Sequence, residues 1–345
     1  MFSGAGSGGV DINKTNARLS ASLSKHQPKI PSQVYQRDSL WEHLEDVVQV
    51  GDFGLELDVD FEYDELGADG SGSTGVKPYS YNEELNLTIL DGVKTGTCPP
   101  KSAAGPIVLT HAEQRENAGQ NNFSLLKQRT ESAKKAMRKY LSLVAWGMSA
   151  AASAVRPHSV TELISQSGTV FGLAKGSQVN SQGLYWMYSQ LESSFGEFAD
   201  NWKKLGRLFA NQVAYSPEDS DSPSLWITDS TVWMAYWEML PPTLRTAPAK
   251  KGDAMPFQEL ELLGIPFRFS IRCPLDASGD HQVFSINKKY LFPKVNTSQN
   301  FDTPPLVNLH PYRPISATQV YWEGAIMCSH FMSQGYATGV KVTTL

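Results

Sequence analysis

The most regular alternation of apolar and polar positions in the chain runs from Leu55 to Tyr63, where every second residue is apolar. A period of two predicts a β-strand with one buried and one exposed face. A second alternation from Tyr79 to Ile89 predicts the returning strand, and Ile107 with Leu109 indicates one more. We therefore expect a long hairpin or small sheet with little core of its own. The exposed face of its first strand carries only acids, namely Glu56, Asp58, Asp60, Glu62 and Asp64.

A Gly/Ser-rich segment, residues 67–75, separates these strands and looks at first like a phosphate-binding loop. Gly70 and Gly75 have the spacing of that motif, but Val76 stands where the motif needs lysine. Lys77 is followed by Pro78, which has no N–H to donate, and no apolar helix follows. We interpret the segment as the flexible tip of the hairpin.

Helical periodicity is strongest over residues 122–147, where the apolar positions share one face. At roughly 1.5 Å per residue this helix would be about 40 Å long. Capping boxes at Ser39 with Glu42 and at Ser194 with Glu197 predict two more helix starts. A further helix is expected from about Asp229 to Leu240, where two prolines stop it. The other face of the long helix is basic and carries Lys127, Lys134, Lys135, Arg138 and Lys139.

The remaining apolar runs predict short strands, and residues 1–38 read as an extended arm without a core. The helices and strands are segregated instead of alternating, which is typical of an α+β fold. Because arm and hairpin lack a core, we expect each to bury its apolar face on another molecule. The predicted strands are 257–263, 265–271 after a turn at Gly264, 283–292 and 319–331.

Composition excludes several classes of protein. The 345 residues carry a formal charge of −5, which argues against a dedicated basic nucleic-acid binder. Three distant cysteines, Cys98, Cys273 and Cys328, indicate reduced thiols and no zinc cluster or disulfide framework. The first residues lack a basic segment followed by an apolar one, so secretion is not expected. No apolar run approaches about 18 residues, so no membrane span is expected either.

The candidate chemistry is sparse. No nucleophile elbow, HExxH or Cys–His signature occurs, so we expect neither an enzyme nor a bound cofactor or metal. Three readings of the acidic face stay open: a solvated surface, a contact with a basic partner, or a cation site. Same-face neighbours on a strand lie about 7 Å apart, too far for several to share one ion. The histidines His111 and His281 look like ordinary surface or strand residues. The aromatic cluster Trp226, Trp233, Tyr236 and Trp237 has helical spacing and favours core over a sugar or base platform.

Several stretches, in order along the chain, are similar to the major capsid proteins of tailed bacteriophages, which have the Hong Kong 97-type fold. The stretches are YSYNEELNLTILDGVKTG, AAGPIVLTHAEQRENAGQNNFSLLKQRTESAKKAMRKYL, SPSLWITDSTVWMAYWEML, and FQELELLGIPFRFS followed by FSINKKYLFP. Together they span most of residues 79–292.

The resemblance implies a division of the chain and a mode of assembly. Such proteins form hexamers and pentamers of an icosahedral shell around double-stranded DNA, in the virion, after assembly in the host bacterial cytoplasm. It also implies a separate scaffolding protein and a portal protein, with a decoration protein as an optional partner, non-specific contact with the packaged DNA, and no membrane. Nothing identifies a Lys–Asn crosslinking pair. The implied parts are an N-terminal arm (1–50), an extended loop (51–112), a peripheral domain (113–194 and 300–345) with the spine helix 122–147, and an axial domain (195–299).

Within that picture, the acidic face from Glu56 to Asp64 is expected to meet Lys134, Lys135 and Arg138 of a neighbouring subunit. Two alternatives remain. One is an encapsulin-like bacterial nanocompartment shell, which shares the fold. The other, of a different class, is an unrecognised hydrolase or carbohydrate-binding module, which would need a concave site.

Overall fold

The computed structural model describes residues 38–63, 92–110, 113, 125–149, 155–180, 183–218, 221–240, 260–310 and 313–342. They belong to two compact units. One unit contains Ala104–Ala136 and Thr303–Val320, and the other Arg37–Ala103, Met137–Asp302 and Tyr321–Leu345. The predicted tip of the hairpin, its predicted returning strand from Tyr79 to Ile89, and nearly all of the arm lie outside the described residues.

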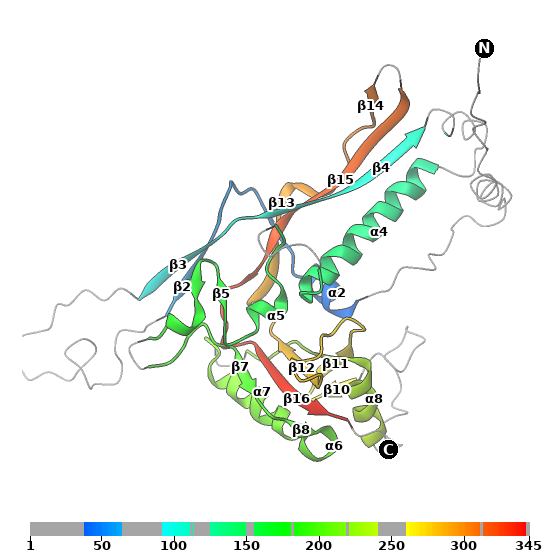
Figure 1. Ribbon diagram of the computed structural model, residues 1–345. Coiled ribbons are helices and arrows are strands. Elements are labelled where there is room, and N and C mark those ends of the chain that lie inside the picture. The colour runs from blue at the N-terminus through cyan, green and yellow to red at the C-terminus, as the bar shows by residue number, and fades with distance from the viewer. Residues whose placement is uncertain are drawn as a thin grey trace, which may run out of the picture. The chain divides into compact units, whose positions relative to one another are not determined.

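The larger unit contains a sheet of seven described strands with two helices packed against it (Figure 1). Helix α7 (Lys204–Ala214) packs along β7 and β16, and α8 (Ser230–Met239) packs against β11. All four residues of β9 are buried, as expected for a central strand covered on both faces. The order is β10 (Leu260–Leu262), β11 (Ile265–Phe269), β9 (Leu225–Thr228), β12 (His281–Ile286), β16 (Gly335–Lys341) and β7 (Gln190–Glu192), with β8 (Gly196–Glu197) also paired to β16.

A second sheet is built around the long strand β15 (Arg313–Cys328). In the larger unit β15 pairs antiparallel with β13 (Leu291–Asp302), and β13 pairs parallel with β1 (Gln49–Gly51). In the smaller unit β15 pairs with β14 (Val307–His310). Strand β4 (Lys101–Thr110) also pairs with β15. Ile107 and Leu109 are buried on β4, which confirms the strand predicted there.

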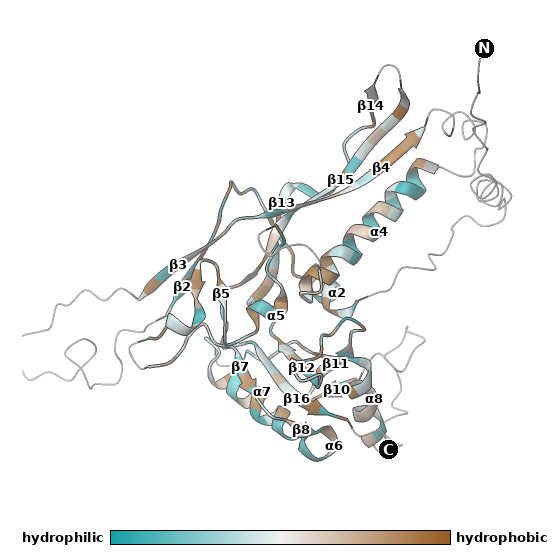
Figure 2. Cartoon of the chain, viewed as in Figure 1, coloured by the Kyte–Doolittle hydropathy of each residue, from teal (hydrophilic) through white to brown (hydrophobic). Residues whose placement is uncertain are grey.

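The predicted long helix is α4 (Leu125–Ala145), and its apolar face is confirmed in the C-terminal half, while Leu126 near the start is 38% exposed. Met137, Leu141 and Val144 are buried, the first two in the same core cluster as α2 (Ser39–Glu45). Figure 2 shows hydrophilic colour along much of α4 and hydrophobic colour at the end next to α2. Burial of this stripe, more than intrinsic propensity, holds such a helix in place.

A buried polar network fixes the start of α2. The Asp38 carboxylate accepts hydrogen bonds from Trp146 Nε1 (3.1 Å) and Ser270 Oγ (2.7 Å), and from Ser142 Oγ. Arg272 donates from Nη1 to Ser142 Oγ (2.6 Å) and lies 3.8 Å from Asp38 Oδ2. Asp38 and Arg272 are each only 5% exposed, so the carboxylate and the guanidinium neutralise each other inside the core.

Two of the predicted helix starts are wrong. Asp38, not Ser39, caps α2, because its side chain accepts from the N–H of Leu40 (3.3 Å). No helix starts at Ser194, which has a positive φ of 54° and precedes strand β8. The residues assigned to that helix form α6 (Phe198–Asn201) and α7.

Other sequence predictions fare better. Asp229 caps α8 by accepting from the N–H groups of Thr231 and Val232, as the predicted helix required. Leu263 and Gly264, with φ of 57° and 76°, form the predicted turn between β10 and β11. The single strand predicted over 283–292 is wrong, because a turn at residues 287–290 separates β12 from β13. The segregated α+β fold class is confirmed.

Candidate functional site

Strand β2 (Leu57–Glu62) and strand β3 (Val93–Cys98) form the base of the extended hairpin. Burial alternates strictly along β2, with Leu57, Val59 and Phe61 inside. This confirms the alternation, but Leu55 lies before the strand and is 90% exposed. The partner strand β3 was not predicted, because its sequence VKTGTC has no apolar alternation.

The outer face of this base is acidic and has no basic residue in register. Asp58, Asp60 and Glu62 are exposed, and their partners on β3 are Thr97, Thr95 and Val93. Thr95 Oγ1 donates to Asp60 Oδ1 at 2.6 Å. Glu56 is exposed just before the strand, and Asp64 lies outside the described residues. The structure therefore brings three of the five candidate acids together on one face.

The inner face of β2 packs on the chain itself. The Phe61 ring lies 5.3 Å from Trp186, 5.8 Å from Phe331 and 6.2 Å from Phe171, centroid to centroid. Tyr63 stacks on Trp186 at 5.7 Å. The expectation that the hairpin must bury its apolar face on another molecule is therefore wrong for its base. Aromatic contacts of this kind contribute about 0.5–1.5 kcal/mol each beyond area burial.

A small hairpin of β5 (Thr169–Val170) and β6 (Leu173–Ala174) holds β3 from the other side. Its turn residues, Phe171 and Gly172, have φ of 54° and 76°, and Phe171 is only 1% exposed. The carbonyl of Phe171 accepts from the N–H of Thr97 at 3.0 Å. Any side chain at position 96 in place of glycine would collide with this turn, since its Cβ would lie 2.9 Å from Phe171 Cβ. A left-handed phenylalanine is costly, so packing must hold it.

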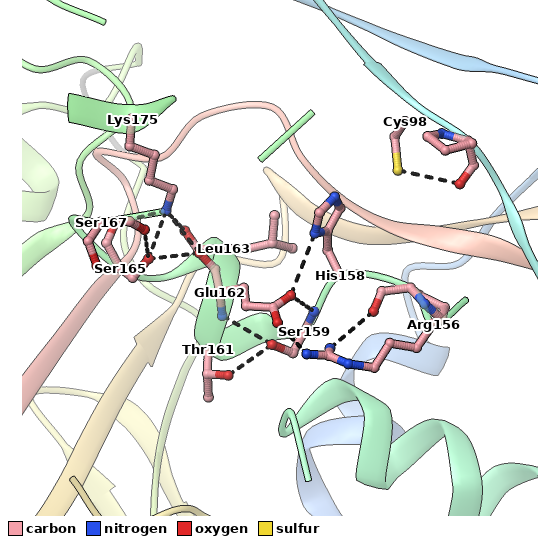
Figure 3. Close-up of polar contacts among 12 residues, drawn as sticks. Cys98, Arg156, His158, Ser159, Thr161, Glu162, Leu163, Ser165, Ser167 and Lys175 are labelled. Atoms are coloured by element: carbon pink, nitrogen blue, oxygen red, sulfur yellow. Dashed lines mark hydrogen bonds and ion pairs between the residues drawn. The ribbon is translucent and has the colours of Figure 1, made fainter. Parts of the chain in front are cut away.

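A polar cluster surrounds the short helix α5 (Val160–Leu163), as Figure 3 shows. Ser159 and Glu162 form a reciprocal capping box, and Glu162 also pairs with Arg156 and with His158 Nδ1 (3.5 Å). Burial tends to raise the pKa of Glu162, but hydrogen bonds from His158, the Ser159 N–H and Arg156 outweigh it and lower that pKa to about 2. The SVTE motif fits the capping-box pattern, so this helix start was readable from the sequence.

Lys175 caps the C-terminal end of α5 with its buried ammonium group. It is fully buried, and its Nζ donates to the carbonyl oxygens of Leu163 (2.7 Å), Ser165 (2.8 Å) and Glu162 (3.0 Å) (Figure 3). Its ammonium also lies 5.0 Å from the centroid of the Phe331 ring. Burial lowers the pKa of Lys175 from 10.5 to about 8. The lysine thus satisfies carbonyls that the end of a helix leaves unpaired. No sequence signal points to this role.

The basic candidates lie on α4 in different settings. Arg138 Nε pairs with Glu45 Oε1 at 3.1 Å, and its guanidinium lies 5.5 Å from the Phe301 ring centroid. Arg138 is therefore engaged within its own chain. Lys134 and Lys135 are partly exposed, and neither forms an ion pair with another described residue.

Catalytic and ligand-binding features are weak in the described part. Across the ranges of the fold description, no three metal-ligating side chains come together. Three members of the aromatic cluster are core as predicted, with Trp226 at 0%, Trp233 at 4% and Tyr236 at 9% exposure. Trp237 is partly buried against the same core, and Trp226 lies on β9 and not on the helix. The Nδ1 atom of His281, at the start of β12, lies 3.0 Å from Asp229 Oδ2, and His111 lies outside the described residues. None of the helices described has the length and apolar composition needed to cross a bilayer.

Comparisons of the sequence give no relative: no family model matches it, and no curated protein matches it. Comparisons of the structure do. The chain is similar to the capsid of cyanophage A-1(L), with a TM-score of 0.62, 11% identity, and coverage of 94% of this chain and 99% of that one. For the capsid of an empty GTA particle, the TM-score is 0.60 and the identity 11%, and the match covers 94% of this chain and 98% of that one. For the SrpI encapsulin of Synechococcus elongatus, the TM-score is 0.55 and the identity 9%, and the match covers 95% of this chain and 98% of that one.

These matches cover 94–95% of this chain and 98–99% of the matched chains, so the likeness is not confined to one domain. The fold is the Hong Kong 97-type fold of phage capsid proteins, as the resemblance in the sequence implied. At 9–11% identity the likeness concerns the fold.

Proposed function

We propose that this chain is the major capsid protein of a tailed phage, which assembles into hexamers and pentamers of an icosahedral shell. The observation that carries the proposal is the end-to-end likeness to the capsid of cyanophage A-1(L), over 94% of this chain and 99% of that chain. The match is not confined to one domain, because it extends over nearly all of both chains.

The site supports a structural role in a second way. The outer acids of β2 carry three negative charges with no cation in register, while the inner face is fixed by Phe61 and Leu57. Such a surface is rigid and single-signed, which suits recognition of a basic surface. We propose that Asp58, Asp60 and Glu62, with Glu56 and Asp64, contact Lys134 and Lys135 of a neighbouring subunit. Arg138 belongs to the same basic face, but it would have to exchange Glu45 for the neighbour.

The parts of the chain follow from the same proposal. Residues 1–50 serve as N-terminal arm, 51–112 as extended loop, 113–194 with 300–345 as peripheral domain, and 195–299 as axial domain. A separate scaffolding protein, a portal protein and an optional decoration protein complete the particle. The shell assembles in the host bacterial cytoplasm, encloses double-stranded DNA, and needs no enzymatic activity of this chain.

Electron microscopy of the full chain tests the proposal, expressed alone and together with its neighbouring gene products. We expect rings or closed shells, with closed shells when the scaffolding protein is present. A chain that stays monomeric and folded at high concentration, with scaffold supplied, contradicts the proposal.

An encapsulin-like shell is the second candidate, favoured by the likeness to the SrpI encapsulin. The content of the particle separates the two. A capsid accepts DNA through a portal and is encoded beside terminase and portal genes. A nanocompartment encloses a cargo enzyme encoded beside it.

A further inference from the structure

Strand β2 pairs with β3 on one side, and no described strand lies along its other edge. The N–H of Tyr63 donates to the carbonyl of Gly92 at 2.9 Å, one step beyond the end of the ladder. Along an antiparallel strand, the backbone groups point alternately towards the partner strand and away from it. The bond from the Thr97 N–H to the Phe171 carbonyl, on the far edge of β3, follows this alternation. The residues of β2 whose backbone groups point away from β3 are therefore Asp58, Asp60 and Glu62.

The free edge of β2, defined by these three residues, lacks hydrogen-bond partners. Within the described part of the chain, their N–H and C=O groups bond to no other residue. All three residues are exposed. Leu55, in step with the buried residues of β2, is 90% exposed just before the strand. An exposed strand edge is a template for a strand from another chain.

Two stretches outside the described residues have the alternation that such a strand needs. Residues 16–24 of the arm read NARLSASLS, in which every second residue is apolar. Residues 79–89 read YSYNEELNLTI. The two stretches differ in charge, because residues 14–29 contain four lysines and arginines and no acid, whereas residues 79–89 contain two glutamates and no basic residue. Beside the carboxylates of β2, like charges repel and opposite charges attract, which favours the arm.

We propose that residues 16–24 of a second copy of this chain add as a strand to the free edge of β2. Backbone hydrogen bonds hold the strand, and its apolar side chains continue the inner side of β2 towards Leu55. Its serines lie on the side of the acids, where a hydroxyl donor fits. Thr95 makes such a contact from β3, since its Oγ1 donates to Asp60 Oδ1 at 2.6 Å.

This contact is separate from the one proposed for the acidic face. The backbone groups of an edge lie in the plane of the sheet, whereas the carboxylates point out from its face. The same strand therefore accepts an arm at its edge and basic side chains on its face. The inference rests on the proposed function, because copies of the chain must meet in an assembly.

Fluorescence anisotropy with the unassembled full chain tests the edge without a shell. The probe is a labelled peptide of residues 14–27. One matched peptide has proline in place of Ala21 and Ser22, so that a donor towards β2 is lost in either strand direction. Another contains residues 16–24 in scrambled order, with the charge unchanged. We expect the probe to bind at least about tenfold more tightly than either peptide. Equal binding of all three peptides overturns the proposal.

Two variants of the chain locate the bound peptide. Asp60→Pro removes an N–H of the free edge and no bond to β3, whereas Asp60→Ser keeps that N–H, and both lose the carboxylate. Asp60→Pro is expected to bind the probe about fivefold more weakly than Asp60→Ser. Equal affinity of the two variants, at equal melting temperature, overturns the proposal. If Asp60→Pro does not fold, the proline peptide decides.

Cysteine cross-linking identifies the copy that supplies the strand. Chains with Asp60→Cys are assembled with chains that carry Ser20→Cys, Ser22→Cys or Ser24→Cys, because facing residues of adjacent strands are close enough for a disulfide. The native cysteines, Cys98, Cys273 and Cys328, are buried.

We expect a disulfide between the two chains for at least one serine position, and none for Leu23→Cys, which lies on the other side of the added strand. Shells that form without this cross-link overturn the inference and leave the proposed function standing. A failure to form shells counts against the proposed function, and the peptide affinities then decide about the edge.

Discussion

Gly96 and Phe171 approach so closely that a Cβ atom on residue 96 would lie 2.9 Å from Phe171 Cβ. Carbon atoms in contact prefer about 3.5–4.0 Å. This contact joins the base of the extended hairpin to the β5–β6 turn, and Phe171 in turn contacts Phe61. The hairpin base is therefore part of the core of the subunit.

The first prediction concerns this contact. Gly96→Ala should lower the free energy of unfolding by about 1–3 kcal/mol, because the added methyl group overpacks the turn. Gly54→Ala is the matched control, since a Cβ there meets nothing within 4 Å. Chemical denaturation measures both. Equal effects of the two substitutions would show that the hairpin base is not packed as described.

Lys175 provides the second prediction. Lys175→Met should destabilise the fold by about 2–4 kcal/mol, because three carbonyl oxygens lose their donor inside the protein. Lys203→Met, at an exposed residue next to α7, is the control and should change little. If Lys175→Met left the free energy of unfolding unchanged, water would be replacing the ammonium group without cost.

The third prediction follows from the pKa of Lys175, which burial lowers from 10.5 to about 8. Below pH 8 the lysine is protonated in both states, and the cost of burying its charge is fully present. Between pH 8 and 10.5 the unfolded chain binds more protons than the folded one, so stability contributed by this group rises with pH. The gain should reach about 3 kcal/mol at most.

Comparison with Lys175→Met isolates this effect from other groups that titrate in the same range. The stability difference between wild type and the variant should grow in favour of the wild type from pH 8 to 10.5. A difference that stays constant over this range would contradict a lowered pKa.

The fourth prediction concerns the network at the start of α2. Asp38→Asn or Arg272→Met alone should cost about 3–5 kcal/mol, because each leaves the other charge buried without its partner. The double variant should lose about 1–3 kcal/mol less than the sum of the two single variants. Thermal or chemical denaturation of all four proteins completes the cycle, and simple additivity would show that the two charges do not interact.

The last prediction tests the proposed contact between subunits. Asp58→Lys with Asp60→Lys should block shell formation, and Lys134→Glu with Lys135→Glu should partly restore it. One exposed pair contributes only about 0–1 kcal/mol, but a shell repeats it many times. Arg138 is left unchanged because Glu45 already binds it.

Glu261→Lys, at an exposed residue of β10, is the matched control for this charge swap. Electron microscopy and the salt dependence of assembly provide the readout. If the swap on β2 leaves both unchanged while the subunit stays folded, the acids are merely solvated.

Much of the fold could be predicted from local sequence. The alternation around Val59, the stripe on α4 and the Asp229 cap each depend on residues within a few positions of one another. The capping pattern at Ser194 gave a wrong helix start, because tertiary structure overrides the local preference there. Gly196 has a φ of 80° and β8 pairs with β16, so the helix starts later.

The candidate site could be predicted from the sequence only in part. The acidic face follows from the period of β2, whereas its partner strand contains Gly96, whose role depends on Phe171, far along the chain. Lys175 and the Asp38 network join residues that no local pattern relates; Asp38 and Ser270 are 232 positions apart. Contacts of that separation are set by the packed fold, which a single sequence does not reveal.

The ladder between β2 and β3 also has a mechanical consequence. Its outermost registered pair is Glu62 with Val93, where the chain leaves towards the hairpin tip. A pull on the tip along the strands would act on β2 and β3 together, so it would load the contacts of this strand pair with the rest of the subunit more than the hydrogen bonds between the two strands. The rings of Phe61 and Tyr63 lie at this end of the ladder, and both contact Trp186. We expect these aromatic contacts to be the first to bear such a load.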